Sequence, residues 1–252
     1  MTFMDGTTLA GFVFVTYIIA GTIKGTLGLG LPTTALTIMT FFLSPFQALA
    51  INLIPMFLTN VWQFSRASNI SRLMRRYAYF ALSLSVTIFA FSFVTGKLSS
   101  QMVQIAVAGA VILFSLYNLA QRPFNLSQKR DKQWQIFFGA MAGIMGAITS
   151  MWAVPLVMYL LSRKLNPKEF VDAAGFLLLV GCVPLSVGYV ATGLVTSDVL
   201  IPAIAGTIGS LSGFQLGARL RAYINAALFR QILLWFFLAM GLRMAVVAFY
   251  AT

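Results

Sequence analysis

The stretch that begins at Ala20 reads AGTIKGTLGLGLP and ends at Pro32. A related stretch, AGIMGAITSMWAVP, begins at Ala142 and ends at Pro155. Both stretches are apolar and interrupted, and Pro32 corresponds to Pro155 at an offset of about 123 residues. Nearly the same offset relates further pairs along the chain: Pro45 with Pro167, and Leu98 with Leu220. Doubled apolar chains with interrupted segments at matching places are typical of transporters, whose substrate site lies between the halves.

Composition indicates the class of protein. The chain has 252 residues, of which 60% are hydrophobic and only 9% are charged. A soluble domain would carry about a quarter charged residues, and a membrane β-barrel would show alternating runs of about ten residues. Here the apolar runs are continuous and near the roughly 20 residues that a spanning helix needs. The sequence therefore predicts an all-α polytopic membrane protein.

The scarcity of reactive side chains limits the chemistry. One cysteine and no histidine argue against disulfides, zinc sites and a histidine base. An intramembrane enzyme would have only Ser150, Cys182 and Asp172 as raw materials, with no paired carboxylates or ligand spacing around them. We therefore expect no catalytic residues, no metal and no cofactor.

The basic residues are concentrated in short connections between apolar segments. A net charge of +12 raises nucleic-acid binding as an alternative, but that function needs an exposed domain, which the sequence lacks. Cytoplasmic loops of membrane proteins carry such an excess of bases and lie close to anionic lipid heads. The predicted partner is thus the bilayer and not nucleic acid. The four basic connections contain 14 of the 17 bases: Arg66, Arg72, Arg75 and Arg76; Arg122, Lys129, Arg130 and Lys132; Arg163, Lys164 and Lys168; Arg219, Arg221 and Arg230.

Placing those connections inside fixes the topology. Residues 134 to 162 run between two basic connections, so they are predicted to form a re-entrant hairpin rather than one crossing. By the repeat, residues 9 to 43 form the matching hairpin. Each half then has three further crossings, an odd number, which inverts the second copy and leaves both termini external. The crossings are residues 44 to 64, 77 to 95, 101 to 120, 170 to 192 and 199 to 218, and the last helix.

This reasoning divides the chain into three parts. A first membrane repeat covers residues 1–121, a basic cytoplasmic linker covers 122–133, and a second, inverted membrane repeat covers 134–252. Each half is a broken re-entrant helical hairpin plus three transmembrane helices.

The hairpins are the predicted location of the substrate site. Their arms, about 15 residues before the turn and 11 to 13 after it, are shorter than a full span and should stop inside the membrane. The helix starts after each break carry partial positive charge and free N–H groups, which suit an anion. The alternative is that the small residues only let helices pack. The candidates in the hairpins are Gly25, Thr26, Gly28, Gly30, Thr33, Thr149, Ser150 and Trp152.

Lys24 favours an anion site over mere packing. A lysine in the middle of an apolar segment costs a few kcal/mol at the bilayer centre unless it pairs or meets water. Lys24 lies between Ile23 and Gly25, far from either predicted loop. Snorkelling of its ammonium group to the cytoplasmic surface is the alternative.

A polar stripe on the next helix supplies further candidates. At 100° per residue, Asn52, Asn60 and Gln63 fall within an arc of about 80°, which should face inward rather than toward lipid. Cys182 corresponds to Asn60 in the second copy, so the two should flank a central site. Side chains of this kind also serve as interhelical contacts alone.

Three strings resemble the TauE/SafE sulfite exporter family, also called TSUP or DUF81. They are GTLGLGLP at residues 25 to 32, LTNVWQ at 58 to 63 and PLVMYLL at 155 to 161. The resemblance implies a bacterial or archaeal cytoplasmic (inner) membrane protein that moves sulfite, sulfoacetate, thiosulfate or related anions and organic acids. The chain departs from the family pattern in copy two, where Met151 and Ala153 stand in the places of Gly28 and Gly30.

The predicted function is export of a small sulfur-containing anion by alternating access around a mid-membrane site. Outward movement of one negative charge gains about 2.3 kcal/mol per 100 mV when the cell interior is negative. The alternatives are an anion channel and a transporter of another small organic acid. The sequence leaves the substrate, sodium coupling and a homodimer open.

Overall fold

The computed structural model describes residues 5–120, 126–220, 223 and 225–250. Every regular element within these ranges is a helix. Two of the basic residues used in the topology argument, Arg122 and Arg221, lie outside the described residues, as does part of the predicted linker 122–133.

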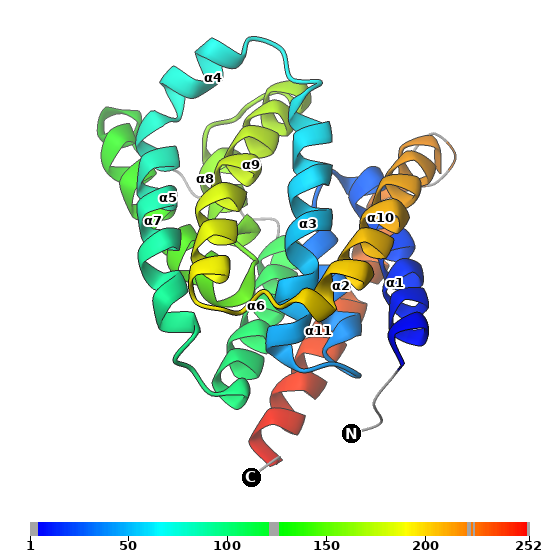
Figure 1. Cartoon of the computed structure of the whole chain (residues 1–252). Helices are drawn as coiled ribbons and strands as arrows, with labels where there is room; N and C mark the ends of the chain where they lie inside the picture. Colours follow the sequence, from blue (N-terminus) through cyan, green and yellow to red (C-terminus); the bar gives the residue numbers. More distant parts are fainter. Residues whose placement is uncertain (1–4, 121–125, 221–222, 224, 251–252) are drawn as a thin grey trace.

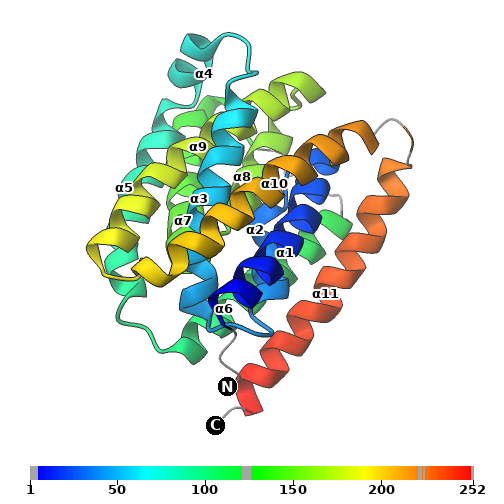
Figure 2. The same cartoon turned by 45° about the vertical axis from the view of Figure 1, so that its right-hand side comes forward.

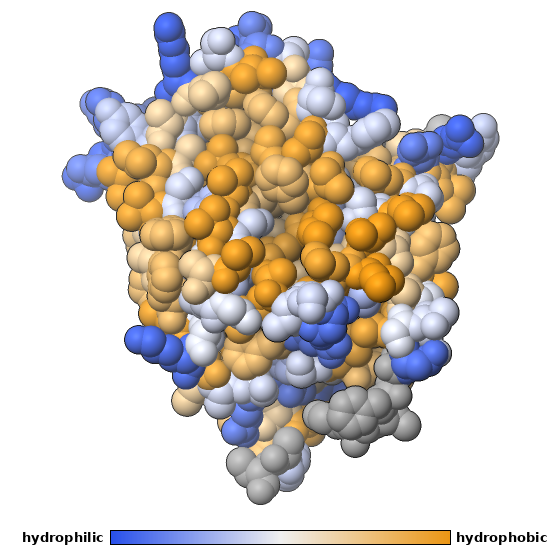
Figure 3. Space-filling model, in the orientation of Figure 1, coloured by the Kyte–Doolittle hydropathy of each residue, from blue (hydrophilic) through white to orange (hydrophobic). Residues whose placement is uncertain are grey.

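Within the described ranges, six helices are long and apolar enough to cross a membrane. They are α1 (Gly6–Leu27), α5 (Ala78–Thr95), α6 (Ser100–Ala120), α9 (Pro167–Ala191), α10 (Leu200–Leu220) and α11 (Ala226–Tyr250). The chain is therefore an all-α polytopic membrane protein, as predicted. Figure 3 shows the broad hydrophobic surface that such a protein presents to lipid, with hydrophilic residues toward its upper and lower margins. A seventh helix, α3 (Pro45–Phe64), is similarly long but carries the buried side chains of Asn52, Asn60 and Gln63.

Two helices are interrupted where the sequence predicted turns. In the first half α1 is followed by α2 (Leu31–Met39), and the break contains Gly28 and Gly30 with φ of 82° and 98°. Glycine adopts these values without steric cost, and Pro32 suits the first turn of α2 because that turn needs no N–H from it. In the second half α7 (Asp131–Thr149) and α8 (Ala153–Ser162) flank a break at Ser150, whose φ is 54°.

The lengths of the arms differ from the expectation. The arms before the breaks have 22 and 19 residues, about 33 and 28 Å at 1.5 Å per residue, so they do not stop short of a span. The arms after the breaks have only 9 and 10 residues, about 14 and 15 Å, and do stop short. In α1, Gly21 and Gly25 stay helical, and both pack against the backbone of α10.

Helices of each half pack mainly on helices of the other half. The long arm α1 packs mainly on α10 of the second half, and the long arm α7 packs on α5 of the first half (Figures 1 and 2). The helices α3 and α9 pack on each other, as do α6 and α11. One hydrophobic core therefore contains residues of both halves. The division into repeats at residues 122–133 describes the sequence and stays a prediction.

The contact between α1 and α10 is close because glycines line it. A Cβ atom built on Gly213 would lie 2.2 Å from the carbonyl oxygen of Ile18, and one built on Gly217 would lie 2.1 Å from that of Thr22. These distances are far below van der Waals contact. The two backbones approach each other so closely only because α10 has no side chains at these positions.

Basic elements gather at one end of the molecule. The short helix α4 (Ile70–Arg76) caps this end at the top of Figure 1 and contacts α9, and α10 runs upward toward the same end. The start of α1 and the end of α11 lie at the opposite end. A one-turn 3-10 helix, η1 (Gln128–Arg130), precedes α7, and another, η2 (Ser197–Val199), precedes α10.

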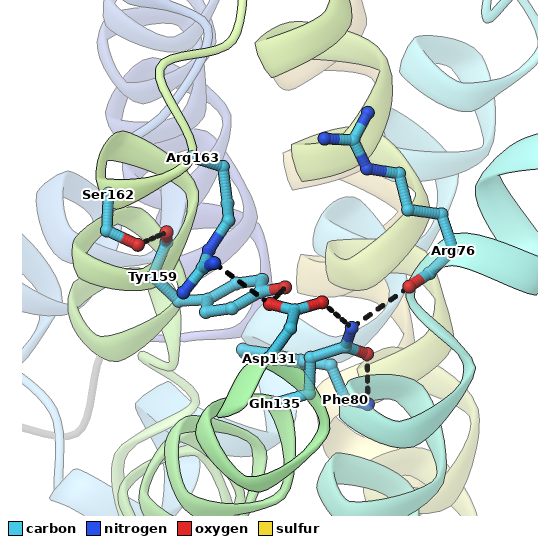
Figure 4. Close-up of polar contacts among 7 residues, drawn as sticks. All are labelled: Arg76, Phe80, Asp131, Gln135, Tyr159, Ser162 and Arg163. Carbon is cyan, nitrogen blue, oxygen red and sulfur yellow. Dashed lines mark hydrogen bonds and ion pairs between the residues drawn. The ribbon is translucent and has the colours of Figure 1, made fainter. Parts of the chain in front are cut away.

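Asp131 anchors the second hairpin at the basic end. Its carboxylate accepts hydrogen bonds from the Tyr159 hydroxyl at 3.0 Å and from Gln135 Nε2 at 2.8 Å, and it pairs with Arg163 at 3.1 Å (Figure 4). Gln135 also donates to the carbonyl oxygen of Arg76 at 3.0 Å and accepts from the N–H of Phe80 at 3.2 Å (Figure 4). Both ends of the hairpin are thereby joined to the start of α5.

Asp131→Asn is expected to lower stability by about 2 kcal/mol, because it removes the charge opposite Arg163, whose side chain is only 6% exposed. The melting temperature in detergent measures the effect. Asp198→Asn is the matched control, since Asp198 is exposed. Equal melting temperatures for the two variants would show that the Asp131 contacts contribute nothing to stability.

Candidate functional site

Lys24 lies inside the protein, one turn before the break in α1. Its side chain is 2% exposed, and its carbonyl oxygen accepts the N–H of Gly28 at 2.7 Å. The ammonium group donates to Thr59 Oγ1 at 3.1 Å and to Asn60 Oδ1, both on α3. The side chain is thus directed into the helix bundle and does not snorkel to the surface.

The partners of Lys24 are themselves held by further hydrogen bonds. The Thr59 hydroxyl donates to the carbonyl oxygen of Pro55 at 2.8 Å, which leaves its lone pairs for the ammonium group. Asn60 Nδ2 donates to Cys182 Sγ at 3.2 Å, and that thiol donates to the carbonyl oxygen of Leu178 at 3.2 Å. This chain fixes the Asn60 amide with its oxygen toward Lys24, and it joins α1, α3 and α9.

The charge of Lys24 has no carboxylate to balance it. Within the described residues the one ion pair joins Arg163 to Asp131, at the basic end. Burial of an ammonium group among neutral dipoles is costly, and an approaching anion would relieve that cost. This burial agrees with the anion-binding role predicted for Lys24, which stays a prediction.

A small cavity lies beside Lys24 and touches both helix breaks. Its volume is about 20 Å³, enough for about one water molecule. Residues from α1, α2, α3, α8 and α9 surround it, so the two halves meet there. The lining is Lys24, Leu29, Gly30, Leu31, Pro32, Thr33, Met56, Asn60, Ser150, Met151, Trp152, Ala153 and Leu178.

Two helix starts face this cavity. The N-cap of α2 is Gly30 and that of α8 is Trp152, and neither start has a side-chain cap. The N–H groups in the first turn of a helix have no partner within the helix, and they carry partial positive charge. Both short arms therefore add anion-binding potential to that of Lys24.

Trp152 closes the second-copy side of the site. It is 1% exposed and packs between two glycines: a Cβ atom on Gly146 or on Gly181 would lie 2.9 Å from its indole ring. The neighbouring Ser150 is buried beside Tyr189, whose hydroxyl donates to the carbonyl oxygen of Ala147 at 2.7 Å. Met151 and Ala153, which stand where copy one has glycines, fill space at the cavity wall.

The structure brings together six of the residues predicted from the sequence. Lys24, Gly30 and Thr33 from copy one line the cavity with Asn60, and Ser150 and Trp152 line it from copy two. Their contact with a substrate stays a prediction.

The other predicted residues lie around the cavity rather than on it. Asn52 accepts a hydrogen bond from the Tyr17 hydroxyl at 2.8 Å, and Gln63 donates to the carbonyl oxygen of Val171 at 3.5 Å. The stripe on α3 therefore faces inward, but only Asn60 reaches the cavity. Gly25 packs on α10, Thr26 donates to the carbonyl oxygens of Thr22 and Gly217, Thr149 donates to that of Met145, Cys182 supports Asn60, and Gly28 shapes the turn.

Sequence reasoning missed Thr59, and Asp172 lies away from the cavity. Thr59 lies next to Asn60, but the hydroxyl of a threonine in an apolar helix usually donates to a carbonyl oxygen of the preceding turn, as Thr59 does here. The sequence therefore gave no sign that this hydroxyl also accepts a hydrogen bond from Lys24. Asp172 is the acid that the sequence offered, with Ser150 and Cys182, as raw material for an intramembrane enzyme. It accepts hydrogen bonds from the N–H and hydroxyl of Ser68, beside α4 at the basic end. The structure therefore gives Asp172 no contact with the cavity.

Of three comparisons with known proteins, the one with protein-family profiles gave a match. Searches of curated proteins and of solved structures gave no significant match. Residues 13–244 match the profile described as "Sulfite exporter TauE/SafE", which spans both helix breaks, Lys24 and nearly all of the described helices. The chain therefore belongs to the TauE/SafE family of membrane transport proteins.

Proposed function

We propose that the protein is a secondary transporter of small oxyanions, sulfite, sulfoacetate or thiosulfate being the substrate class that its family suggests. The observation that carries the proposal is the buried ammonium group of Lys24, which has no carboxylate partner in the described chain and lies on a cavity between two uncapped helix starts. A compact anion with several acceptor oxygens complements that arrangement.

The size of the cavity supports a carrier rather than an open pore. Its 20 Å³ is enough for only about one water molecule, so the two breaks must separate before a sulfur oxyanion fits. Such separation is the motion that alternating access requires. Counter-flow of labelled anion in proteoliposomes is expected, and ohmic single-channel currents would contradict the carrier.

An inverted repeat would allow the two breaks to separate toward either side of the membrane. The start of α7 contacts the end of α4 through Gln135 and Arg76, at the basic end, whereas α1 begins at the opposite end. The long arms of the two hairpins thus run in opposite directions, which supports inversion of the second copy.

The orientation follows from the charges. With the basic end in the cytoplasm, next to anionic lipid heads, both termini are external. The resemblance to the TauE/SafE family suggests that the membrane is the cytoplasmic (inner) membrane of a bacterial or archaeal cell. Outward movement of a singly charged anion then gains about 2.3 kcal/mol per 100 mV, so export needs no coupling ion.

Asn60→Asp is expected to abolish anion binding. The new carboxylate would lie against the Lys24 ammonium group and supply the counter-charge internally. Thermal shift measures this: an oxyanion at about 100 times its Kd stabilises the unchanged protein by about 2.7 kcal/mol, and the variant by almost nothing. The panel is sulfite, sulfate, thiosulfate, sulfonates and carboxylates.

Asn166→Asp is the matched control for this experiment. Asn166 is exposed and caps α9, a role that aspartate also fills. If no anion stabilises the unchanged protein, or if the Asn60→Asp protein responds like the control, the proposed site is wrong.

A further inference from the structure

A second and much larger cavity adjoins the first on the side of the basic end. It has a volume of about 530 Å³ and lies between the break after α1, the ends of α6 and α8, and the start of α11. Leu29 and Gly30 line both cavities, so the break in the first hairpin is the wall between them. The larger cavity is wide enough for a small oxyanion, unlike the space beside Lys24.

Among the described residues that line this larger cavity, Arg230 is the charged one. Most of the lining is apolar, including Phe114, Val157 and Phe237. Arg230 is half-buried on the first turns of α11, and its Nη2 donates to the Asn118 carbonyl oxygen at 3.3 Å and to Asn118 Oδ1 at 3.1 Å. A guanidinium group between apolar walls attracts anions more strongly than one in open solvent.

The contacts of Arg230 leave its charge available. The ion pair between Arg163 and Asp131 is the one formed among the described residues, and Arg230 takes no part in it. Its hydrogen bonds in the described chain go to neutral oxygens of Asn118, which an oxyanion can displace. Asn118 Nδ2 also donates to the carbonyl oxygen of Phe114 at 2.8 Å. This bond would hold the Asn118 side chain in place when an oxyanion displaces its contact with Arg230.

We propose that this cavity, which we term the Arg230 vestibule, is a second anion subsite that receives the oxyanion from the basic side before it reaches Lys24. Arg230 binds two oxygens of the anion through its planar guanidinium group. Opening of the break at Leu29 and Gly30 then gives the anion access to Lys24. This inference rests on the proposed function, because it places the vestibule on the path to that site.

Leu233→Cys provides a test that does not depend on transport. Leu233 lines the vestibule one turn after Arg230 and is half-buried, whereas the native Cys182 is 0% exposed. We expect a sulfonate-bearing methanethiosulfonate to label the new cysteine faster than a trimethylammonium-bearing one. Arg230→Gln should reduce this preference at least about tenfold, from the loss of a nearby charge in a low-dielectric space. Arg219→Gln, an exposed base at the same end, should leave it unchanged.

The transport assay separates this inference from the proposed function. Arg230→Gln should raise KM for anion supplied at the basic side about tenfold, with kcat within a factor of two, because binding at Lys24 is intact. Equal labelling by the two reagents, or an unchanged preference in Arg230→Gln, overturns the vestibule. Preferential labelling by the anionic reagent without any saturable transport would uphold the vestibule as an anion site and overturn the proposed function.

Discussion

Lys24→Met abolishes saturable anion transport and anion-dependent stabilisation, with an expected loss of at least about 100-fold in kcat/KM. Methionine has a similar length and no charge, so the cavity keeps its walls and loses its cation. The same substitution should leave the melting temperature equal or raise it, since an ammonium group that lacks a carboxylate partner is no longer buried. Transport of labelled oxyanion into proteoliposomes and a melting curve measure the two effects.

Lys97→Met is the matched control, because Lys97 is exposed in the connection between α5 and α6. It should transport at the normal rate. A Lys24→Met protein with unchanged kcat/KM would show that the ammonium group does not bind the substrate. A protein that loses both activity and stability would assign Lys24 a structural role instead.

Gly213→Ala has the largest expected effect on folding. The added Cβ atom would lie 2.2 Å from the carbonyl oxygen of Ile18 and 2.9 Å from the amide nitrogen of Thr22, both backbone atoms of α1. A backbone cannot rotate away as a side chain can, so α1 and α10 must move apart. We expect a loss of about 3 kcal/mol or more, read as a lower melting temperature and a lower yield of monodisperse protein.

Gly109→Ala is the control for this prediction. Gly109 lies inside α6 with no atom within 4 Å of its added Cβ, so alanine should be neutral or should stabilise by about 0.5–1 kcal/mol through helix propensity. Equal melting temperatures of the Gly213→Ala and Gly109→Ala proteins would show that the helix contact adapts without cost.

The broken helices were predictable because their signals are local. Gly28, Gly30 and Pro32 act on the backbone within a few residues of themselves, and the structure breaks the chain there. The family was predictable too, from strings in both halves of the chain, and the match over residues 13–244 spans both breaks. The length of the long arm α1 was not predictable, because its helix continues through Gly21 and Gly25, which pack against the backbone of α10, a contact distant in sequence.

The predicted polar stripe shows where sequence reasoning stops. Periodicity placed Asn52, Asn60 and Gln63 on one inward face, and all three are buried. Only Asn60 reaches Lys24, since the Tyr17 hydroxyl holds Asn52 and Gln63 contacts α9. A helical arc gives the direction of a side chain but not its depth along the neighbouring helix, which is set by contacts distant in sequence.

The sequence by itself determined the membrane class, the two breaks and the presence of a lysine within an apolar segment. These features depend on composition and on backbone preferences that act over a few residues. Only the tertiary structure decided that Lys24 meets Thr59 and Asn60, that both breaks line one cavity, and that Arg230 faces its larger neighbour. Such contacts arise from helix packing between the halves, where close approach of small residues selects one arrangement among many that the apolar pattern would allow.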